Sequence, residues 1–456
     1  MTLTLYNTMT RQLESFKPMK EGYVGLYACG PTVYDRAHLG NARPVIVFDV
    51  LHRLLALDYK VTYVRNITDI DDKIIRASQQ TETPIDLLTR ETTRLYHEDM
   101  ATLGNLPPTH EPCATHHVED MIHMIQTLLK QEHAYEAEGH VLFSVESYPQ
   151  YGSLSRSNQD EILAGARVEI APYKRHPSDF VLWKPARDNE PGWQSPWGRG
   201  RPGWHIECSA MSAVFLGKTF DIHAGGQDLI FPHHENEIAQ SCAAHKTKHF
   251  ARYWMHNGIL TVNGEKMSKS LGNFLTVEDL LRKARGETIR YAVLMTHYRQ
   301  ALDWTDQSLQ QAKSSLDRFY TALEGYKEET SLSNIDSQFL AHLKNDMNTP
   351  AAFARLHILA TEINKEKDGV AKRKGQQTLK ASANVLGLLE KDTLEWFQAK
   401  ESSQGFDEKE IEKLIEDRLT ARRLKNFKEA DDIRDRLAAC NIILEDSPDG
   451  TKWKRS

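Results

Sequence analysis

The sequence lacks any apolar run near the roughly 20 residues that a membrane-spanning helix needs, and no secretory signal follows Met1. It also has little cysteine: five residues, widely scattered in a chain of 456. A sparse, odd-numbered set argues against a disulfide framework and favours a reducing compartment. We therefore expect a cytoplasmic protein with no membrane partner, in which some thiols are available as metal ligands.

An excess of positive charge is absent as well, since the formal net charge is -6 at pH 7. This excludes a protein coated in basic side chains, although a local basic patch can still bind nucleic acid. There is no internal repeat and no long low-complexity tract. The 456 residues are too many for one compact core, so the length predicts roughly three domains.

The first part of the chain has the pattern of a nucleotide-binding α/β unit. An apolar run predicts a strand over 23–29, helical spacing of apolar residues predicts a helix over 41–57, and residues 60–66 predict a second strand. This order predicts a parallel sheet with a right-handed crossover. Ligands of such sheets bind beyond the carboxyl ends of the strands, where Cys29 and Thr68 fall.

Prolines interrupt residues 105–196, which we expect to form an insertion in this domain rather than a second core. The sheet is expected to resume at 220–223, ahead of a helix that Pro232 opens. Residues 253–262 are expected to form one strand, followed by a hairpin turn at Asn263-Gly264. At the C-terminus we expect two helices and a hairpin, over 407–424, 427–439, 442–445 and 451–454.

These patterns predict an α/β fold: a Rossmann-like parallel nucleotide-binding sheet with an inserted connective subdomain, then a helical bundle and a small α+β C-terminal module. The expected boundaries are 1–104 with 197–250 for the catalytic domain, 105–196 for the insertion, 251–306 for a linker fold, 307–400 for the bundle and 401–456 for the C-terminal module.

Two short segments have features of a nucleotide site. The KMSKS segment at 266–270 offers two ammonium groups, which suit a triphosphate whose negative charge grows during reaction. The HLGN segment at 38–41 opens a helix and suits the same phosphates from the other side. Alone, a Lys/Ser pentapeptide is usually a solvated loop. Together and in this order, the two segments resemble the paired signatures of class I aminoacyl-tRNA synthetases.

A third group of residues suits a metal ion. On a helix, His233 and Glu237 share a face, so both side chains can reach one ion; a solvated polar helix surface is the alternative. Cys29 and Cys208 can add thiolates, although a buried lone cysteine more often packs as a small hydrophobe. Two thiolates, an imidazole and a carboxylate form a donor set that fits Zn²⁺.

Four segments are similar to the cysteinyl-tRNA synthetase family: CGPTVYD at 29–35, NITDIDDK at 66–73, GWHIEC at 203–208, and 220–237, which ends in HHENE. The likeness covers 29–273, and the helical and C-terminal parts follow in the family's order. It implies that one Zn²⁺ is held by Cys29, Cys208, His233 and Glu237. It also implies that the thiol of the substrate coordinates this zinc.

The resemblance implies roles for the remaining site residues. Thr68, Trp204 and His223 would line the cysteine pocket, with core packing as the alternative for Trp204. Catalysis at the α-phosphate would fall to His38, Asn41, Lys266 and Lys269; the family's first signature often ends in His, and Asn41 can still donate hydrogen bonds. ATP, as its Mg²⁺ complex, would be bound by Gly30, Thr32, His38, Asn41, Gly226, Asp228 and Lys269.

The C-terminal segment interleaves basic residues with Phe427 and Trp453, a composition that suits single-stranded bases. Nearby acidic residues leave a solvated pair of charged helices as the alternative. By resemblance it is an anticodon-binding module, which with the helical bundle would bind tRNA(Cys) to a monomeric enzyme.

The expected activity is the ATP-dependent ligation of L-cysteine to tRNA(Cys) through a cysteinyl-adenylate. One alternative is a cysteine ligase that delivers the adenylate to a small aminosugar, which needs neither a long helical region nor a basic terminal module. The other is a non-catalytic RNA-binding paralogue, which has no reason to keep both signatures and the metal-ligand set.

Overall fold

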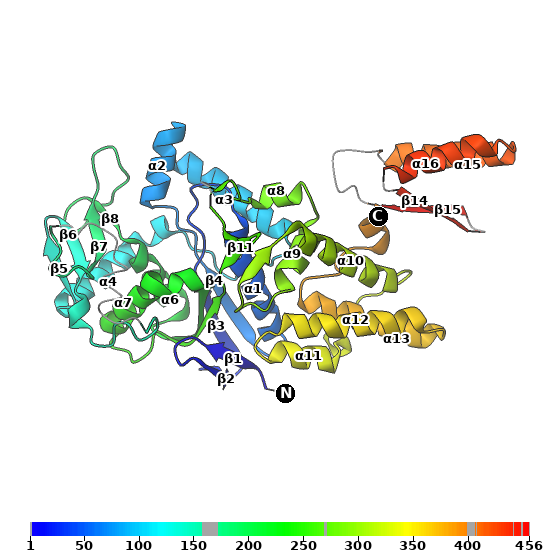
Figure 1. Cartoon of the computed structure of the whole chain (residues 1–456). Coiled ribbons are helices and arrows are strands. Elements are labelled where there is room, and N and C mark those ends of the chain that lie inside the picture. Colours follow the sequence, from blue (N-terminus) through cyan, green and yellow to red (C-terminus); the bar gives the residue numbers. More distant parts are fainter. Residues whose placement is uncertain are drawn as a thin grey trace. The chain divides into compact units, whose positions relative to one another are not determined.

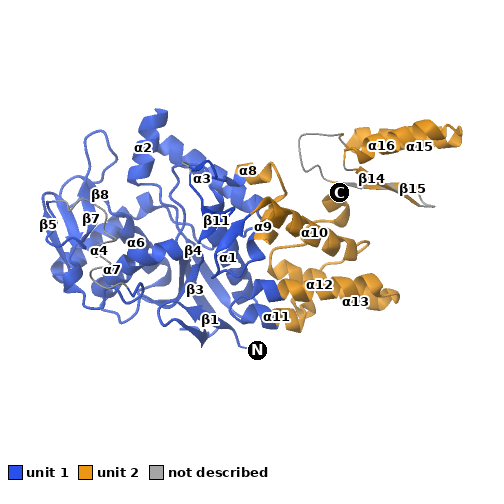
Figure 2. Cartoon of the chain, in the orientation of Figure 1, with its two compact units in different colours: residues 1–277, 293–304, 341–351 blue, residues 278–292, 305–340, 352–456 orange. Residues whose placement is uncertain are grey.

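The computed structural model describes residues 2–156, 172–268, 271–398, 406, 408–440, 442–447 and 450–455. The chain divides into two compact units (Figure 2). Unit 1 comprises Met1–Val277, Val293–Trp304 and Ala341–Ala351, and unit 2 comprises the remaining ranges, Glu278–Ala292, Thr305–Leu340 and Ala352–Ser456. Among the described helices, none has the length and apolar character that crossing a bilayer requires. The finer five-part division remains a prediction.

Unit 1 is built on a parallel four-stranded sheet with the strand order β10-β9-β3-β4, of which β3 and β4 are labelled in Figure 1. Its apolar strand residues are largely buried, and α1 (Leu39–Leu55) connects β3 to β4, which confirms the predicted strand–helix–strand unit. The strands are β3 (Tyr23–Ala28), β4 (Lys60–Arg65), β9 (Phe220–Gly226) and β10 (Ala251–Asn257); an antiparallel pair, β1 (Thr4–Asn7) and β2 (Gln12–Ser15), precedes them.

The inserted region forms a four-stranded antiparallel sheet and several helices. Its core is shared with the catalytic helices α6 (Trp204–Leu216) and α7 (Glu235–His245), because Val118, Phe143 and Met211 belong to one buried cluster. From β4 to α6 the described elements are α2 (Asp72–Thr81), α3 (Ile85–Thr102), a 3-10 turn (Ala114–His117), α4 (Val118–Lys130), β5 (Ala134–Ala137), β6 (His140–Phe143), a second 3-10 turn (Val145–Ser147), β7 (Phe180–Pro185) and β8 (Gly200–Pro202); α2 and α3 precede the expected insertion and β8 follows it.

One local prediction was wrong. Residues 253–262 form two strands in different sheets, β10 and β11 (Leu260–Val262), and between them stands Gly258, where a Cβ would overlap the carbonyl oxygen of Gln300. The helix predicted to open at Pro232 is confirmed. A 3-10 turn (Gln227–Leu229) and a π turn (Ile230–His234) precede α7, which is assigned from Glu235. Phe231 is the non-helical residue of the π turn, so the helical backbone that continues into α7 resumes at Pro232.

The predicted turn after β11 is confirmed. Asn263 and Gly264 have φ values of 51° and 80°, and they join β11 to the antiparallel strand β12 (Glu265–Lys266). Positive φ at both positions is the geometry for which Asn-Gly is favoured in tight hairpins. A third strand, β13 (Leu302–Trp304), pairs in parallel with β11 and completes a small sheet in the order β12-β11-β13.

The second half of the chain is mainly helical, as predicted, and ends in the expected α+β module. In that module the antiparallel strands β14 and β15 pack on α15 and α16 through Ile415, Leu437 and Trp453; turn residues 448–449 lie outside the described chain. The elements are α8 (Val277–Leu281), α9 (Gly286–Leu294), α10 (Asp306–Ala322), a 3-10 turn (Leu332–Asn334), α11 (Ser337–Lys344), α12 (Thr349–Lys365), α13 (Gly369–Val385), α14 (Thr393–Gln398), α15 (Glu408–Arg423), α16 (Phe427–Ala438), β14 (Ile442–Ser447) and β15 (Gly450–Arg455).

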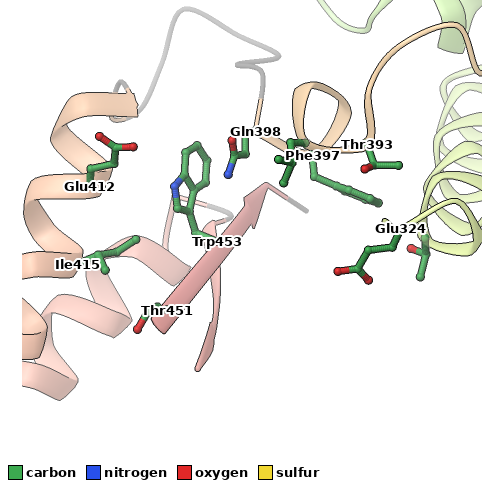
Figure 3. A pocket seen from close by; sticks show the side chains of 10 residues that line it. Glu324, Thr393, Phe397, Gln398, Glu412, Ile415, Thr451 and Trp453 are labelled. Atoms are coloured by element: carbon green, nitrogen blue, oxygen red, sulfur yellow. The ribbon is translucent and has the colours of Figure 1, made fainter. Parts of the chain in front are cut away.

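The two aromatic residues singled out in the C-terminal module differ in their surroundings. Phe427 is 61% exposed, whereas Trp453 is 7% exposed and packs in the module's core. Trp453 also lines a cavity of about 360 Å³ in unit 2, together with Phe397 of α14 and Ile415 of α15 (Figure 3). None of the predicted site residues lines this cavity. Of the two rings, Phe427 is the one presented to solvent.

An ion pair joins the hairpin to α15, and its loss is expected to destabilise the module. Both Arg418 Nη atoms lie 2.9 Å from the carboxylate oxygens of Asp446, and this contact holds the pKa of Asp446 well below its usual range. A carboxyl with a lowered folded-state pKa stabilises above its unfolded pKa of about 3.9 and loses that contribution as the pH falls. Because the carboxyl is partly exposed, we expect Asp446→Asn to cost about 0.5–1 kcal/mol at pH 7.

Hydrogen exchange of the module's amides at pH 7, in the full-length chain, would measure this loss. Asp432→Asn is the matched control, since Asp432 is an exposed residue of α16. Equal protection in both variants would show that the Arg418–Asp446 pair contributes nothing.

Candidate active site

Four side chains converge at the carboxyl end of the central sheet. Cys29 follows β3, Cys208 lies on α6, His233 lies in the π turn that leads into α7, and Glu237 lies in the first turn of α7; one ligand atom from each falls within 4.8 Å of the others. The two sulfur atoms are 3.8 Å apart, and His233 Nε2 lies 2.9 Å from Glu237 Oε1. Because this mixed S/N/O set is compact and almost wholly buried, its geometry and chemistry fit a metal ion such as Zn²⁺.

The charges in this cluster are strongly coupled. Burial raises the pKa of the Glu237 carboxyl, but His223 and His233 outweigh it and hold that pKa well below its usual range. Burial also disfavours protonated His233, yet Glu237 and Cys208 raise its pKa to about 10. A hydrogen bond from the Cys29 thiol lowers the pKa of Cys208 to about 6. Burial, with Cys208 and Glu237 nearby, raises the pKa of the Cys29 thiol well above its usual range, so metal binding would have to displace the proton of Cys29.

Further histidines surround the cluster. His223 Nε2 lies 2.7 Å from Glu237 Oε2, so the residue predicted for the substrate pocket also contacts a metal-ligand candidate. His234 Nε2 lies 3.4 Å from Cys29 Sγ, and its Nδ1 lies 2.7 Å from His256 Nε2. A second metal-competent set thus combines Cys29 and Glu237 with His223 and His234.

Sequence reasoning missed three residues of this region: His234, His256 and Glu207. His234 stands inside the quoted HHENE run, so its proximity could have been considered. His256 comes close only because β10 pairs with β9. Glu207 precedes Cys208 and was treated as part of its motif.

The predicted cysteine-pocket residues lie next to the metal candidates. Thr68 is buried, and its Oγ1 donates a 2.7 Å hydrogen bond to Glu207 Oε2 and accepts one from Asn66 Nδ2. The ring of Trp204 stacks on His233 with a centroid distance of 4.1 Å and remains 39% exposed. Trp204 is therefore not a core residue, and its open side can meet a ligand.

The HLGN segment forms the start of α1. His38 is the N-cap residue, and its Nδ1 accepts from the backbone N–H of Asn41 at 3.3 Å. In return, Asn41 Oδ1 accepts from the backbone N–H of His38 at 3.2 Å. This reciprocal capping box orders the helix N-terminus, the end that carries a partial positive charge and binds anions.

The two signatures lie side by side. A Cβ on Gly40 would lie 3.5 Å from the Cε atom of Met267, so the KMSKS segment passes next to the HLGN turn. Beyond that segment, the ring of Phe274 contacts the His38 ring at 5.0 Å. Lys266 is exposed at the end of β12, whereas Lys269 lies outside the described residues.

The remaining predicted ATP-binding residues line the same sheet edge. A Cβ on Gly30 would overlap the carbonyl oxygen of Asn66, so glycine is needed where the chain leaves β3. Thr32 pairs with Thr68 through an isolated parallel bridge. Gly226 ends β9, and a Cβ there would overlap Asp228 Oδ1. Gly30, Thr32 and Gly226 therefore lie at the edge of the sheet that carries the metal candidates.

Three family models match successive parts of this chain. Residues 15–314 match the family model of the class I (C) tRNA synthetase catalytic domain, residues 338–390 the DALR domain, and residues 408–453 the cysteinyl-tRNA ligase anticodon binding domain. The chain is 57% identical over 466 residues to a cysteine–tRNA ligase of Paramagnetospirillum magneticum and 55% identical over 463 residues to that of Rhodospirillum rubrum, covering 100% of each protein in both alignments.

Among solved structures, the methionyl-tRNA synthetase of Mycobacterium tuberculosis bound by methionyl-adenylate superposes with a TM-score of 0.57 at 14% identity, over 83% of this chain and 92% of that one. At this identity the likeness concerns the fold alone. Full-length identity above one half, together with the matching catalytic model, establishes that the chain belongs to the cysteine–tRNA ligase family of class I aminoacyl-tRNA synthetases.

Proposed function

We propose that the chain joins L-cysteine to tRNA(Cys) at the expense of ATP, through an enzyme-bound cysteinyl-adenylate. The observations that carry this proposal are that, within unit 1, Met267 of the KMSKS segment lies next to the HLGN turn and that a thiol-rich cluster gathers at the carboxyl end of the sheet. The names of the full-length relatives support it.

Cys29, Cys208, His233 and Glu237 would hold one Zn²⁺. When bound, this ion would take the substrate's thiol as a thiolate ligand, which an alcohol cannot match. A pocket without a metal separates small isosteric side chains by only about ten- to a few-hundred-fold, so metal coordination would account for the rejection of serine. Substrate coordination requires an open position, hence either a five-coordinate ion or a loosely held Glu237. The hydrogen bond from His223 to Glu237 offers that carboxylate another partner.

The chain's own groups would then position the reactants. Thr68, Trp204 and His223 would contact the cysteine, while Gly30, Thr32, Gly226 and Asp228 would contact ATP with its Mg²⁺. The substrate carboxylate attacks the α-phosphorus and pyrophosphate departs, so no protein nucleophile is needed. Charge on these phosphates would be stabilised by His38, Asn41, Lys266 and Lys269.

In the second step, a terminal ribose hydroxyl of the tRNA attacks the carbonyl carbon of the adenylate and AMP departs. The helical bundle and the C-terminal module would hold the tRNA, with the exposed ring of Phe427 available to stack on a base. We propose that the enzyme acts as a monomer.

Cysteine-dependent exchange of pyrophosphate into ATP tests the first step. We expect exchange with cysteine, little with serine, and loss of exchange after treatment with a zinc chelator, restored by added Zn²⁺. Transfer of labelled cysteine to tRNA(Cys) then tests the second step. Exchange without transfer, but with capture by a small aminosugar, would favour the alternative ligase, and absence of exchange would leave the RNA-binding paralogue.

A further inference from the structure

A buried cation lies close behind the HLGN turn without being part of it. Arg43 is on α1, two residues after Asn41, and is only 1% exposed. Burial lowers the pKa of its guanidinium to about 10. Within the described chain its hydrogen-bond partners are all backbone carbonyl groups, with no carboxylate among them. Burying a charge in this way is costly and calls for an explanation.

The four carbonyl groups belong to two separate chain connections. Nη1 donates to Gly258 at 2.7 Å and Ile259 at 2.6 Å, in the link between β10 and β11. Nη2 donates to Tyr298 at 3.2 Å and Gln300 at 2.6 Å, in the segment that leads into β13. Arg43 therefore binds both connections through which the chain enters the β12-β11-β13 sheet. This sheet carries the first KMSKS lysine, because β12 ends at Lys266.

The two connections touch each other at the same point. A Cβ on Gly258 would overlap the carbonyl oxygen of Gln300 and lie 2.8 Å from that of Arg299. Only glycine allows this approach, and the planar guanidinium fork fits the carbonyl groups that result. This junction is what divides the strand expected over 253–262.

The far end of the KMSKS segment is attached to the same helix start. The backbone N–H of Leu39 donates to the carbonyl oxygen of Leu275 at 3.0 Å, and that of Val277 donates to Ala37 at 2.9 Å. The chain from Lys266 to Phe274 is thus anchored on both sides to the beginning of α1: by Arg43 before it and by backbone pairing after it.

We propose that Arg43 is a positioning residue for adenylate formation: it sets the distance between Lys266, at the start of the KMSKS segment, and the His38/Asn41 pair. The inference rests on the proposed function, because Lys266 and that pair must act on one triphosphate. It predicts that a change at Arg43 harms the step at the α-phosphate and leaves cysteine capture and transfer to tRNA largely intact.

The test compares Arg43→Lys and Gly258→Ala in the full-length chain. Lysine keeps the charge but loses the fork, and alanine forces the two connections apart while keeping Arg43. A displacement of about 1 Å at a reacting group can cost about a hundredfold in rate. We therefore expect both variants to lower the kcat of pyrophosphate exchange by about a hundredfold. The KM for cysteine and the single-turnover transfer rate from preformed adenylate should stay within about twofold.

Arg53→Lys is the matched control, because Arg53 is a largely buried arginine near the other end of α1 that pairs with Asp49. It should exchange pyrophosphate normally. Normal exchange by Arg43→Lys would overturn the positioning role, as would parallel losses of exchange, transfer and resistance to urea, which indicate a structural role only. If the unmodified chain shows no cysteine-dependent exchange, the proposed function is wrong and this inference falls with it.

Discussion

Cys208→Ser is expected to remove most of the bound zinc and to raise the KM for cysteine at least about a hundredfold, more than the usual cost of disturbing groups behind a metal ligand. Cys208 is buried and its sulfur lies 3.8 Å from that of Cys29, so a serine hydroxyl would replace a readily ionised thiol with a group that stays protonated. Elemental analysis of the purified variant gives the zinc content, and pyrophosphate exchange gives the KM.

Cys242→Ser provides the control for this experiment. Cys242 is also buried on the helix that carries Glu237, but it does not belong to either metal-competent set. It should keep one zinc per chain and a normal KM. Should Cys208→Ser retain its zinc, or lose it with no change in KM, metal recognition of the substrate would have to be abandoned.

Lys269→Ala is expected to lower the kcat of adenylate formation by about a hundred- to a thousandfold, the usual effect of removing one group that stabilises charge in the transition state. The dissociation constant for cysteine should hardly change, because the thiol-rich cluster and Thr68 lie on other elements. Equilibrium binding of cysteine without ATP, measured beside single-turnover adenylation, separates the two effects.

Glu265→Ala is a suitable neighbour for comparison, since Glu265 is an exposed charged residue on the strand that leads to KMSKS. Its adenylation rate should match that of the unmodified chain. If Lys269→Ala weakened cysteine binding as much as it slowed adenylation, the lysine would act on the pocket as a whole and not on the phosphates.

Several elements that position the site could be predicted because short-range patterns determine them. The apolar runs of β3 and β4, the helical spacing in α1 and the Asn263-Gly264 turn all depend on residues a few positions apart. The pairing of His233 with Glu237 is of the same kind, because one helical turn separates them.

The unpredicted features depend on contacts between distant segments. The Asn257-Gly258 pair is a turn signal of the kind used at Asn263-Gly264, but only the fold shows that Gln300 packs against Gly258. His256 reaches His234 across two elements, and Glu207 acquires a partner only when Thr68 of a distant segment folds against it. Arg43 has the appearance of an ordinary helix residue until its four carbonyl partners are known.

The order of residues alone was sufficient to identify the family, and it indicated four metal-ligand candidates and the two segments proposed to bind phosphate, since each resides in a short segment. Folding was needed to reveal that the four candidates lie together, which histidines surround them, and that Arg43 binds the two connections ahead of the KMSKS segment. Such contacts join residues far apart in the chain, and burial and close packing of the whole unit, rather than any local preference, bring them within hydrogen-bond reach.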